Sequence, residues 1–599
     1  MNTATDTGIF PDVATGALLF LVVFGTYLRL LAPGIALEDS GEFATAALTL
    51  SLTHPPGYPL YILAGKLFSL LPVGSPAFRL GMMSAASTGL AATFLYAFIR
   101  KLVSGPSTTV ARILAALPTV AFACAPALAL QAVMPDKYAF NCALVCAAML
   151  STLTAFRREG NRLGPLALLA GLALAHHMQV LYLSFAAVGL LWRERLRITG
   201  RTAVLLALLA VPGLSLKPVA LPLMSRASSS LMYGELSTAP LTRRYLSAYD
   251  YSGRFKAFTP AKKAARLWNE GIAGLWRQAG PPVLALAVLG LFPLWRGSAP
   301  VLLTGGAGAL FALALIANFD IAGTGYYLLP VAAFLCALAG AGLALLRARL
   351  GIAVALAAGL LAAGWPAWRG LPPADFSRYH GAVDWARDLL SSLPPGSVLV
   401  TQHDDDFFPP MYIQRVLGEG DGVVLVHRPF VTRLWYHVQA ERMYPGFRLL
   451  DPALIPWGAT VEPEALINIF LRSHYGRRPV AFTYIANAET AGGFTLDPAN
   501  CVYVVGRRGN QRRLPRAAEF GARLRRFRLR TAFGPYPDGP RTREVAGAWA
   551  ALWTQLAVRW WDRGDQAEAK ACLNHALEYP NTRVVKADLE RLKETIGGL

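Results

Sequence analysis

The sequence predicts a polytopic α-helical membrane protein with a soluble α/β domain and a short helical tail at its C-terminal end. Of the 599 residues, 54% are hydrophobic and only 16% are charged, whereas soluble proteins carry about 25% charged residues. Apolar runs of roughly 20 residues, the length that crosses a bilayer as a helix, recur through residues 1–370. From about residue 371 the composition changes to that of a soluble domain.

The apolar runs of spanning length are predicted to be transmembrane helices. They are residues 12–32, 80–99, 113–131, 139–156, 202–222, 281–296, 299–317, 325–346 and 351–368. Residues 58–71 form an apolar run that is too short to span comfortably, so we expect an interfacial or re-entrant helix there.

Residues 164–192 allow two topologies. The stretch is apolar, His176 and His177 interrupt it, and arginines flank it on both sides. One long tilted helix would reverse the topology downstream, whereas two short helices would return the chain to the same side. The hairpin places all basic loops on one side, so the positive-inside rule favours it and predicts about eleven spans with the N-terminus inside. The segments then predicted outside are the Asp39 loop, Asp136, the two histidines, residues 223–280 and everything after residue 370.

The net charge of +21 does not indicate nucleic-acid binding. Much of it is arginine in short loops between apolar runs, where positive residues mark the cytoplasmic side. The rest lies in residues 223–280 and near the C-terminus, where it could meet anionic lipid headgroups or an anionic substrate. No cysteine and histidine spacing predicts a zinc site, so no metal ligand is assigned from spacing.

Short runs rich in β-branched and aromatic residues follow residue 371 and are typical of strands. They are residues 397–401, 422–426, 480–484 and 501–505, with helical stretches such as 377–393 among them. This pattern predicts a small α/β domain over residues 371–535, after a transmembrane domain of residues 1–370. Residues 536–599 are predicted to be helical, and Gly564, Ala569, Ala576 and Pro580 follow the spacing of a tetratricopeptide helix pair.

A polar stretch follows the first predicted span, with Asp39 and Glu42 three positions apart. On a helix two such residues share a face. Asp-x-x-Glu at a helix start is also the pattern of a capping box, in which side chains satisfy backbone N–H groups. Alternatively, one carboxylate is a general base or a metal ligand at the membrane surface, where charge is costly and usually functional. Both interpretations hold together if Glu42 caps the helix and Asp39 is the base.

Two further motifs carry histidine. His54-Pro55-Pro56-Gly57-Tyr58-Pro59 is rigid because its prolines fix φ, and its glycine permits a turn. It is either a connector back into the membrane or a support that holds His54 and Tyr58 toward a site. His403-Asp404-Asp405-Asp406 follows a predicted strand, where an acidic cluster can bind metal or sugar; a solvated loop is the alternative.

The remaining candidate site residues lie near the ends of apolar runs or in the long loop after residue 222. They are Asp136, His176, His177, Arg226, Arg244, Tyr245 and Asp320. Asp136 is either part of an ordinary helix-end charge pair or a second acidic group facing Asp39. Adjacent histidines cannot face the same way, so at most one is expected to act, for example on a phosphate. The arginines either snorkel to lipid headgroups or clamp a lipid-linked phosphate, which suits guanidinium geometry.

The pattern Asp39-Ser40-Gly41-Glu42-Phe43, followed by Leu52-Thr53-His54-Pro55-Pro56-Gly57-Tyr58-Pro59-Leu60-Tyr61, resembles the signature of a known family. The family comprises bacterial relatives of the vertebrate transmembrane protein O-mannosyltransferases, within the GT-C superfamily of integral membrane glycosyltransferases. The similarity covers most of residues 12–430. The resemblance implies a GT-C-like fold, a sugar donor carried on polyprenyl phosphate, inverting transfer and a catalytic acid at Asp39. The chain departs from the family at Asp136, where relatives tend to have Glu before Val-Tyr.

These observations and the resemblance predict a glycosyltransferase of a bacterial inner membrane, with its C-terminal domain in the periplasm. Asp39, with Glu42 beside it, would be the base on a hydroxyl of a protein or envelope glycan. His54, one of the two adjacent histidines, and Arg226 or Arg244 would hold the phosphate of the donor, whose sugar the resemblance suggests is mannose. No cofactor is assigned, and a divalent cation stays open.

Two other classes of function are alternatives. A transporter or flippase of a lipid-linked glycan would also use outward-facing basic residues, but such proteins show internal repeats and charged or broken helices near the midplane. This sequence shows no repeat, and its charges lie at helix ends. A non-catalytic envelope scaffold would use the helical tail but leaves the polar loop residues unexplained.

Overall fold

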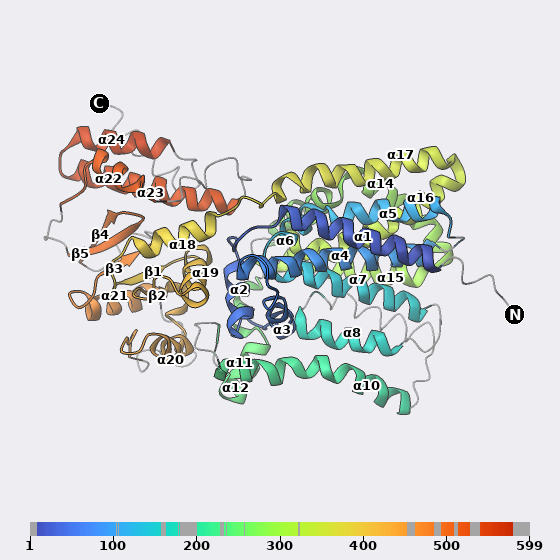
Figure 1. Cartoon of the computed structure of the whole chain (residues 1–599), viewed down its shortest axis with the longest axis horizontal. Coiled ribbons are helices and arrows are strands. Elements are labelled where there is room, and N and C mark those ends of the chain that lie inside the picture. The colour runs from blue at the N-terminus through green and yellow to red at the C-terminus, as the bar shows by residue number, and fades with distance from the viewer. Residues whose placement is uncertain are drawn as a thin grey trace. The chain divides into compact units, whose positions relative to one another are not determined.

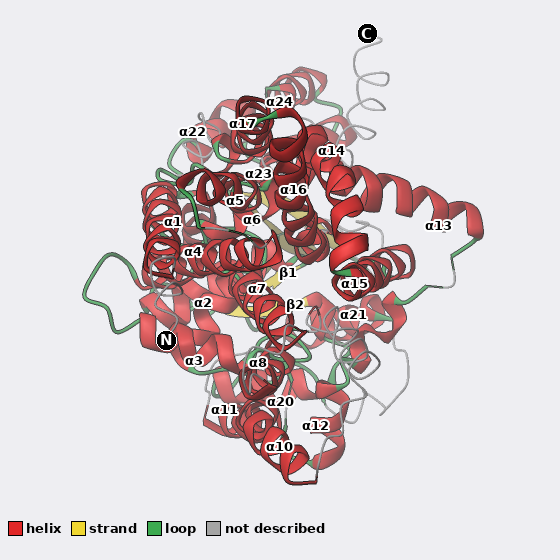
Figure 2. Ribbon diagram, turned by 90° about the vertical axis from the view of Figure 1, so that its right-hand side faces the viewer, coloured by secondary structure: helices red, strands yellow, loops and turns green. Residues whose placement is uncertain are grey.

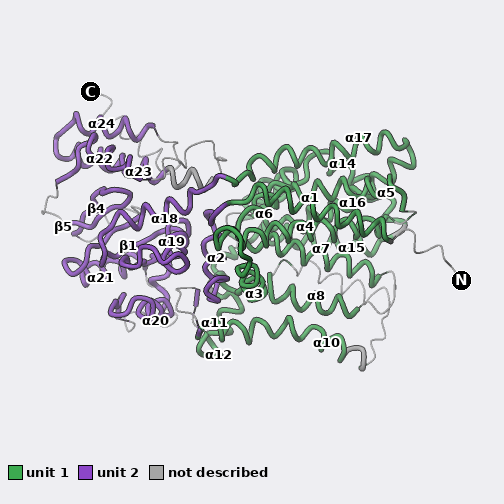
Figure 3. Tube along the Cα trace, in the orientation of Figure 1, with its two compact units in different colours: residues 1–32, 54–226, 236–377 green, residues 33–53, 227–235, 378–599 purple. Residues whose placement is uncertain are grey.

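The computed structural model describes most of the chain and divides it into two compact units. The described residues are 9–103, 105, 107–156, 163–177, 179, 200–227, 233–234, 236–256, 258–320, 324–451, 462–483, 493–507, 513–527 and 540–578. Unit 1 comprises residues 1–32, 54–226 and 236–377, and unit 2 comprises residues 33–53, 227–235 and 378–599 (Figure 3). Unit 2 therefore includes a short N-terminal segment besides the C-terminal part of the chain.

Unit 1 is built from long apolar helices (Figure 1). Helix α14 packs along α16, α4 along α7, and α1 along α4. The helices of the unit are α1 (Ile9–Leu30), α3 (Pro59–Phe68), α4 (Pro76–Val103), α5 (Thr109–Ala123), α6 (Pro126–Ala132), α7 (Lys137–Phe156), α8 (Leu163–His176), α10 (Gly200–Ser215), α11 (Leu221–Ala227), α12 (Ala239–Leu246), α13 (Pro260–Arg266), α14 (Ala273–Gly297), α15 (Ala299–Asn318), α16 (Leu329–Leu350) and α17 (Ile352–Gly370).

The helices confirm a multi-pass membrane protein. Within the described residues, eight helical segments are long and apolar enough to cross a membrane, or nine if the bent pair of α5 and α6 is one span. Helices α3 and α8 are shorter apolar helices, and α3 lies where the sequence predicts a run too short to span. The total of about eleven spans stays a prediction. Residues 180–192, which would decide between the two topologies of that stretch, lie outside the described residues.

Two predicted spans differ from the observed helices for reasons of proline chemistry. The predicted helix 113–131 is broken, with α5 and α6 bent by 73°, because Ala125 has φ −56 and ψ 130 before Pro126, and a residue before proline avoids the helical region. The predicted start at residue 281 is instead a kink inside α14, where Gly280 has φ 74. The preceding apolar residues of α14 are already helical.

Small residues allow close packing in the core of unit 1. A Cβ on Gly290 would lie 2.0 Å from the carbonyl oxygen of Leu338, and a Cβ on Gly342 would lie 2.1 Å from that of Leu286. The backbones of α14 and α16 therefore approach so closely that only glycine fits at these two positions, as is common between membrane helices.

Unit 2 contains a five-stranded mixed sheet with the strand order β2-β1-β3-β5-β4; its strands are yellow in Figure 2. Strand β1 (Val398–Thr401) pairs in parallel with β2 (Val424–His427) and β3 (Val480–Phe482), while β5 (Val502–Arg507) is antiparallel to β3 and to β4 (Phe494–Ala499). Strands β1, β2 and β3 are buried throughout, as expected where both faces of a sheet are covered.

Helices surround this sheet and end the chain. They are α18 (Gly381–Ser391), α19 (Asp404–Tyr412), α20 (Leu434–Met443), α21 (Pro463–His474), α22 (Ala517–Leu524), α23 (Pro540–Asp562) and α24 (Gln566–Leu577). Strand β4 is not predicted from the sequence, because Asp497 and Pro498 disfavour a strand and are tolerated only at an edge. Helices α23 and α24 pack against each other, and their tetratricopeptide-like nature stays a prediction. The predicted domain boundary near residue 535 lies outside the described residues.

Candidate functional site

Helix α2 (Ser40–Thr49) begins directly after Asp39, which occupies its N-cap position. The Asp39 side chain makes no capping hydrogen bond to the helix. The capping-box interpretation is therefore wrong for this side chain, and its carboxylate is directed elsewhere. The buried Glu42, in the first turn of α2, shares the helix face that the spacing of three predicts.

Helix α19 shows what a capping box looks like in this protein. The backbone N–H of His403 donates to Oδ1 of Asp406 at 2.8 Å, and the reciprocal cap is also present. The Thr483 hydroxyl donates to the same carboxylate. Burial raises the pKa of Asp406, because a buried carboxylate is costly to ionise. Asp406 in the predicted acidic motif therefore serves the start of α19.

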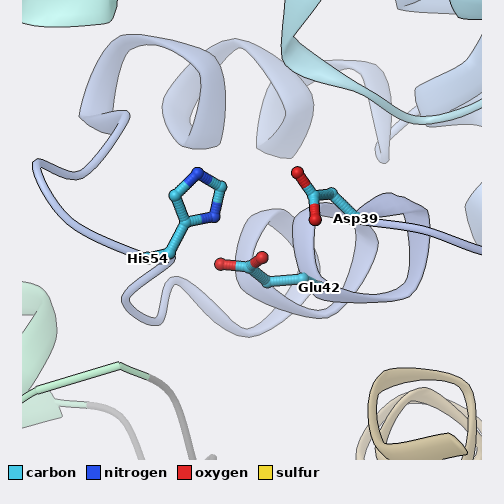
Figure 4. Close-up of side chains that lie close together, drawn as sticks. All are labelled: Asp39, Glu42 and His54. Atoms are coloured by element: carbon cyan, nitrogen blue, oxygen red, sulfur yellow. The ribbon is translucent and has the colours of Figure 1, made fainter. Parts of the chain in front are cut away.

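The side chains of Asp39, Glu42 and His54 converge (Figure 4). One oxygen or nitrogen atom from each lies within 4.8 Å of the other two. Glu42 is only 1% exposed, whereas Asp39 and His54 are half-buried. Two carboxylates and an imidazole at this separation can accept a proton from a hydroxyl or hold a divalent cation.

The His-Pro-Pro-Gly-Tyr-Pro segment turns tightly before α3. The N–H of Gly57 donates to the carbonyl of His54 at 3.0 Å, and Gly57 has φ +78, which favours glycine. A Cβ at this position would lie 2.8 Å from Leu221 and 3.0 Å from the Tyr245 hydroxyl. The predicted site residue Tyr245, which is buried, therefore packs against this turn.

Tyr58 links His54 to the two adjacent histidines. Its hydroxyl lies 3.1 Å from Nε2 of His54, and its ring centroid lies 5.7 Å from those of both His176 and His177. Both rings reach Tyr58 because α8 ends at His176, so the helical spacing that would separate two neighbouring side chains no longer applies. That only one of the two histidines acts stays a prediction.

An aromatic cluster extends from His177. Tyr138 lies 5.5 Å from His177 and 4.8 Å from Tyr326 between ring centroids. Tyr327 lies 6.2 Å from both Tyr138 and His177. Aromatic faces are suited to the apolar face of a sugar ring or to a cation.

Lys137 is a functional candidate that sequence reasoning did not assign. It is 2% exposed, beside the 1% exposed Asp136, and its Nζ lies 3.7 Å from Oδ1 of Asp136. Nζ also lies 4.5 Å from the Tyr138 ring and 5.8 Å from the Tyr58 ring. The signal in the sequence was a lysine at the edge of an apolar helix, where buried charge usually has a function.

The remaining predicted site residues have other contacts. Arg226 is exposed near the end of α11, and Arg244 stacks over Tyr249 at 4.9 Å. Asp320 lies 3.9 Å from the guanidinium of Arg266. None of these contacts reaches the Tyr58 cluster.

Known proteins resemble the part of the chain that contains these residues. Residues 39–199 match the family model described as the Protein O-mannosyl-transferase TMEM260 N-terminal domain. The Protein O-mannosyl-transferase TMEM260 of Mus musculus is 44% identical over 59 residues, which are 10% of this chain and 8% of that protein. The corresponding Dictyostelium discoideum protein is 32% identical over 87 residues, 14% of this chain and 11% of that protein. The resemblance to protein O-mannosyltransferases is therefore confirmed, and it is carried by residues 39–199. The aligned segments span only about a tenth of these relatives.

A solved structure resembles a larger part of the chain. The crystal structure of ArnT from Cupriavidus metallidurans in the apo state has a TM-score of 0.51 and 15% sequence identity, and the match covers 82% of this chain and 98% of that one. At this identity the similarity concerns the fold alone, and it supports the polytopic membrane architecture.

Proposed function

We propose that this protein is a membrane glycosyltransferase that moves a sugar from a polyprenyl-phosphate carrier to a hydroxyl acceptor on the outer face of the membrane. The observation that carries the proposal is the convergence of Asp39, Glu42 and His54 at the beginning of the segment that matches the O-mannosyltransferase model. Mannose is the first donor sugar to test. The acceptor would be a protein or an envelope glycan.

Asp39 would be the general base. Its carboxylate would take the proton of the acceptor hydroxyl while that oxygen forms a bond to the anomeric carbon. The bond from the anomeric carbon to the carrier phosphate breaks at the same time, and the electron pair leaves with the phosphate. Attack from the side opposite the leaving group inverts the anomeric centre. Asp39 suits this role better than Glu42, because Asp39 is half-buried and Glu42 is 1% exposed.

The leaving phosphate would be held by groups around Tyr58. Lys137 lies between the Tyr58 and Tyr138 rings, and His54 donates to or accepts from the Tyr58 hydroxyl. A cation and hydrogen-bond donors that face a developing anion in a water-poor site stabilise its departure. Arg226 and Arg244, which are more accessible, would bind the carrier phosphate on arrival or contact lipid headgroups.

The location of the protein is part of the proposal. A bacterial inner membrane, with the C-terminal α/β domain in the periplasm, agrees with a carrier-linked donor and with the basic loops of the predicted topology. The C-terminal domain would then face the acceptor.

The decisive experiment measures transfer itself. Purified protein in liposomes would receive polyprenyl-phosphate [¹⁴C]mannose and an envelope fraction as acceptor. We expect label in the acceptor, and the anomeric configuration of the product should be opposite to that of the donor. Heat-treated protein is the control. Movement of the intact labelled lipid across the bilayer, with no transfer from mannose or other hexose donors, would support the flippase instead.

The residues Asp39, Glu42 and His54 also fit a divalent cation. Carboxylate and imidazole ligands suit Mn²⁺ and Zn²⁺, and the three donor atoms already lie within 4.8 Å of one another. A bound cation would supply positive charge that favours departure of the phosphate. His54 would be a ligand through its imidazole.

We therefore expect measurable cation binding by the protein after dialysis against a chelator. Titration with Mn²⁺, followed by electron paramagnetic resonance, should show one tight site that His54→Ala weakens at least about tenfold, because a lost ligand or its orienting partner typically costs that much. His380→Ala is the matched control, since His380 is exposed at the N-cap of α18. Equal binding by the two variants would exclude His54 as a ligand.

A further inference from the structure

The backbone directly before Asp39 adopts an unusual conformation. Glu38 has φ +63, a left-handed value that residues with a side chain adopt only when their surroundings enforce it. Its N–H donates to Oδ1 of Asp405 at 2.6 Å. Asp405 is 5% exposed, so this is a buried hydrogen bond to a carboxylate, and such bonds are among the stronger ones in proteins.

A second contact binds α2 to the same helix. A Cβ on Gly41 would lie 3.0 Å from the carbonyl carbon and oxygen of Phe408, so the first turn of α2 lies directly against the backbone of α19. The Ser40 hydroxyl accepts from the N–H of Ala36 at 3.0 Å and closes the preceding loop. Asp405 and Phe408 thus contact both sides of Asp39 in the chain.

Helix α19 is itself firmly held. It connects the parallel strands β1 and β2 and begins at the carboxyl end of β1. Its capping box and the hydroxyl of Thr483, which follows β3, fix its first turn. The central strands of the sheet therefore support the helix that contacts the Asp39 segment.

We propose that Asp405 is a positioning residue for Asp39 in the proposed transfer, and that the C-terminal α/β domain is thereby a structural part of the catalytic site. The inference rests on the proposed function for its kinetic consequence. Asp405 holds Glu38 in its left-handed conformation, and this sets the direction in which the Asp39 carboxylate leaves the start of α2. The position of the base would otherwise vary with the loop of residues 33–38.

The competing explanation is that Asp405 only stabilises the N-terminus of α19 through its charge. Asp404 provides a matched control for this effect. It occupies the first turn of the same helix, its side chain is 53% exposed, and it lies 3.5 Å from Nε2 of His427. Removal of either carboxylate takes one negative charge from the same helix end, but only Asp405 bonds to Glu38.

The kinetic test compares Asp405→Ala, Asp405→Asn and Asp404→Ala. Displacement of a catalytic group by about 1 Å costs on the order of 100-fold in rate, so Asp405→Ala should lower kcat between about 10-fold and 100-fold and leave the KM for the donor nearly unchanged. Asp405→Asn should recover most of the rate, because its amide oxygen can still accept from Glu38. Asp404→Ala should resemble the wild type. Equal losses in Asp404→Ala and Asp405→Ala would overturn the proposal.

Hydrogen exchange tests the same inference without any activity. The amide of Glu38 should exchange about tenfold faster or more in Asp405→Ala than in the wild type, and at the wild-type rate in Asp404→Ala. Unchanged exchange in Asp405→Ala would refute the positioning role. Faster exchange together with a wild-type protein that transfers no sugar would retain the role of Asp405 in ordering the segment and reject the proposed function.

Discussion

Replacement of Asp39 by Asn is expected to lower the rate of sugar transfer by about 10²–10⁴-fold, the range that a positioned general base contributes. Asparagine has nearly the shape of aspartate but cannot take a proton from the acceptor hydroxyl. Because the Asp39 side chain does not cap α2, the substitution removes no hydrogen bond from the helix start. Thermal unfolding in detergent should therefore stay close to that of the wild type.

The control for this variant is Glu38→Gln. It neutralises the neighbouring carboxylate, which is not part of the cluster formed by Asp39, Glu42 and His54, and it leaves the Glu38 N–H in place. Initial rates at saturating donor would separate the two variants. Full activity of Asp39→Asn would refute the assignment of the base, whereas full activity of both with a loss in Glu42→Gln would transfer the role to Glu42.

The spacing of Asp39 and Glu42 shows how far sequence reasoning could reach. The spacing correctly predicts a helix that begins at residue 40 with both residues on one face. It could not decide between a cap and a base, because that choice depends on where the N-cap carboxylate points. The backbone before Asp39 is held by Asp405, which lies 367 positions away in the chain. A local motif contains no information about such a partner.

The transmembrane helices were predictable for a different reason. Lipid requires the backbone to satisfy its own hydrogen bonds, so hydrophobic length translates almost directly into helices. The errors occur where proline and glycine break this relation, at Pro126 and at Gly280. Burial of particular polar residues was harder to predict. Lys137 looked like half of a helix-end pair, and its contacts come from Tyr58 in a distant loop.

The pair of Asp136 and Lys137 provides the second large prediction. Lys137→Met should lower the free energy of unfolding by about 3–5 kcal/mol, because it leaves the buried Asp136 carboxylate without its cation. The side chains of the pair are only 3% and 2% exposed for Lys137 and Asp136, so water cannot compensate. Denaturant titration in detergent micelles would measure this loss.

The double variant Asp136→Asn with Lys137→Met separates stability from function. It removes both charges at once, so most of the lost stability should return, because replacing a whole buried pair is often close to neutral. Transfer should not return if Lys137 holds the departing phosphate. Arg387→Met is the matched control for loss of an ion pair, since Arg387 and Glu419 are 32% and 45% exposed and such surface pairs contribute about 0–1 kcal/mol. A double variant that transfers sugar at the wild-type rate would limit Lys137 to a structural role and leave the phosphate to His54, the adjacent histidines or the more accessible arginines.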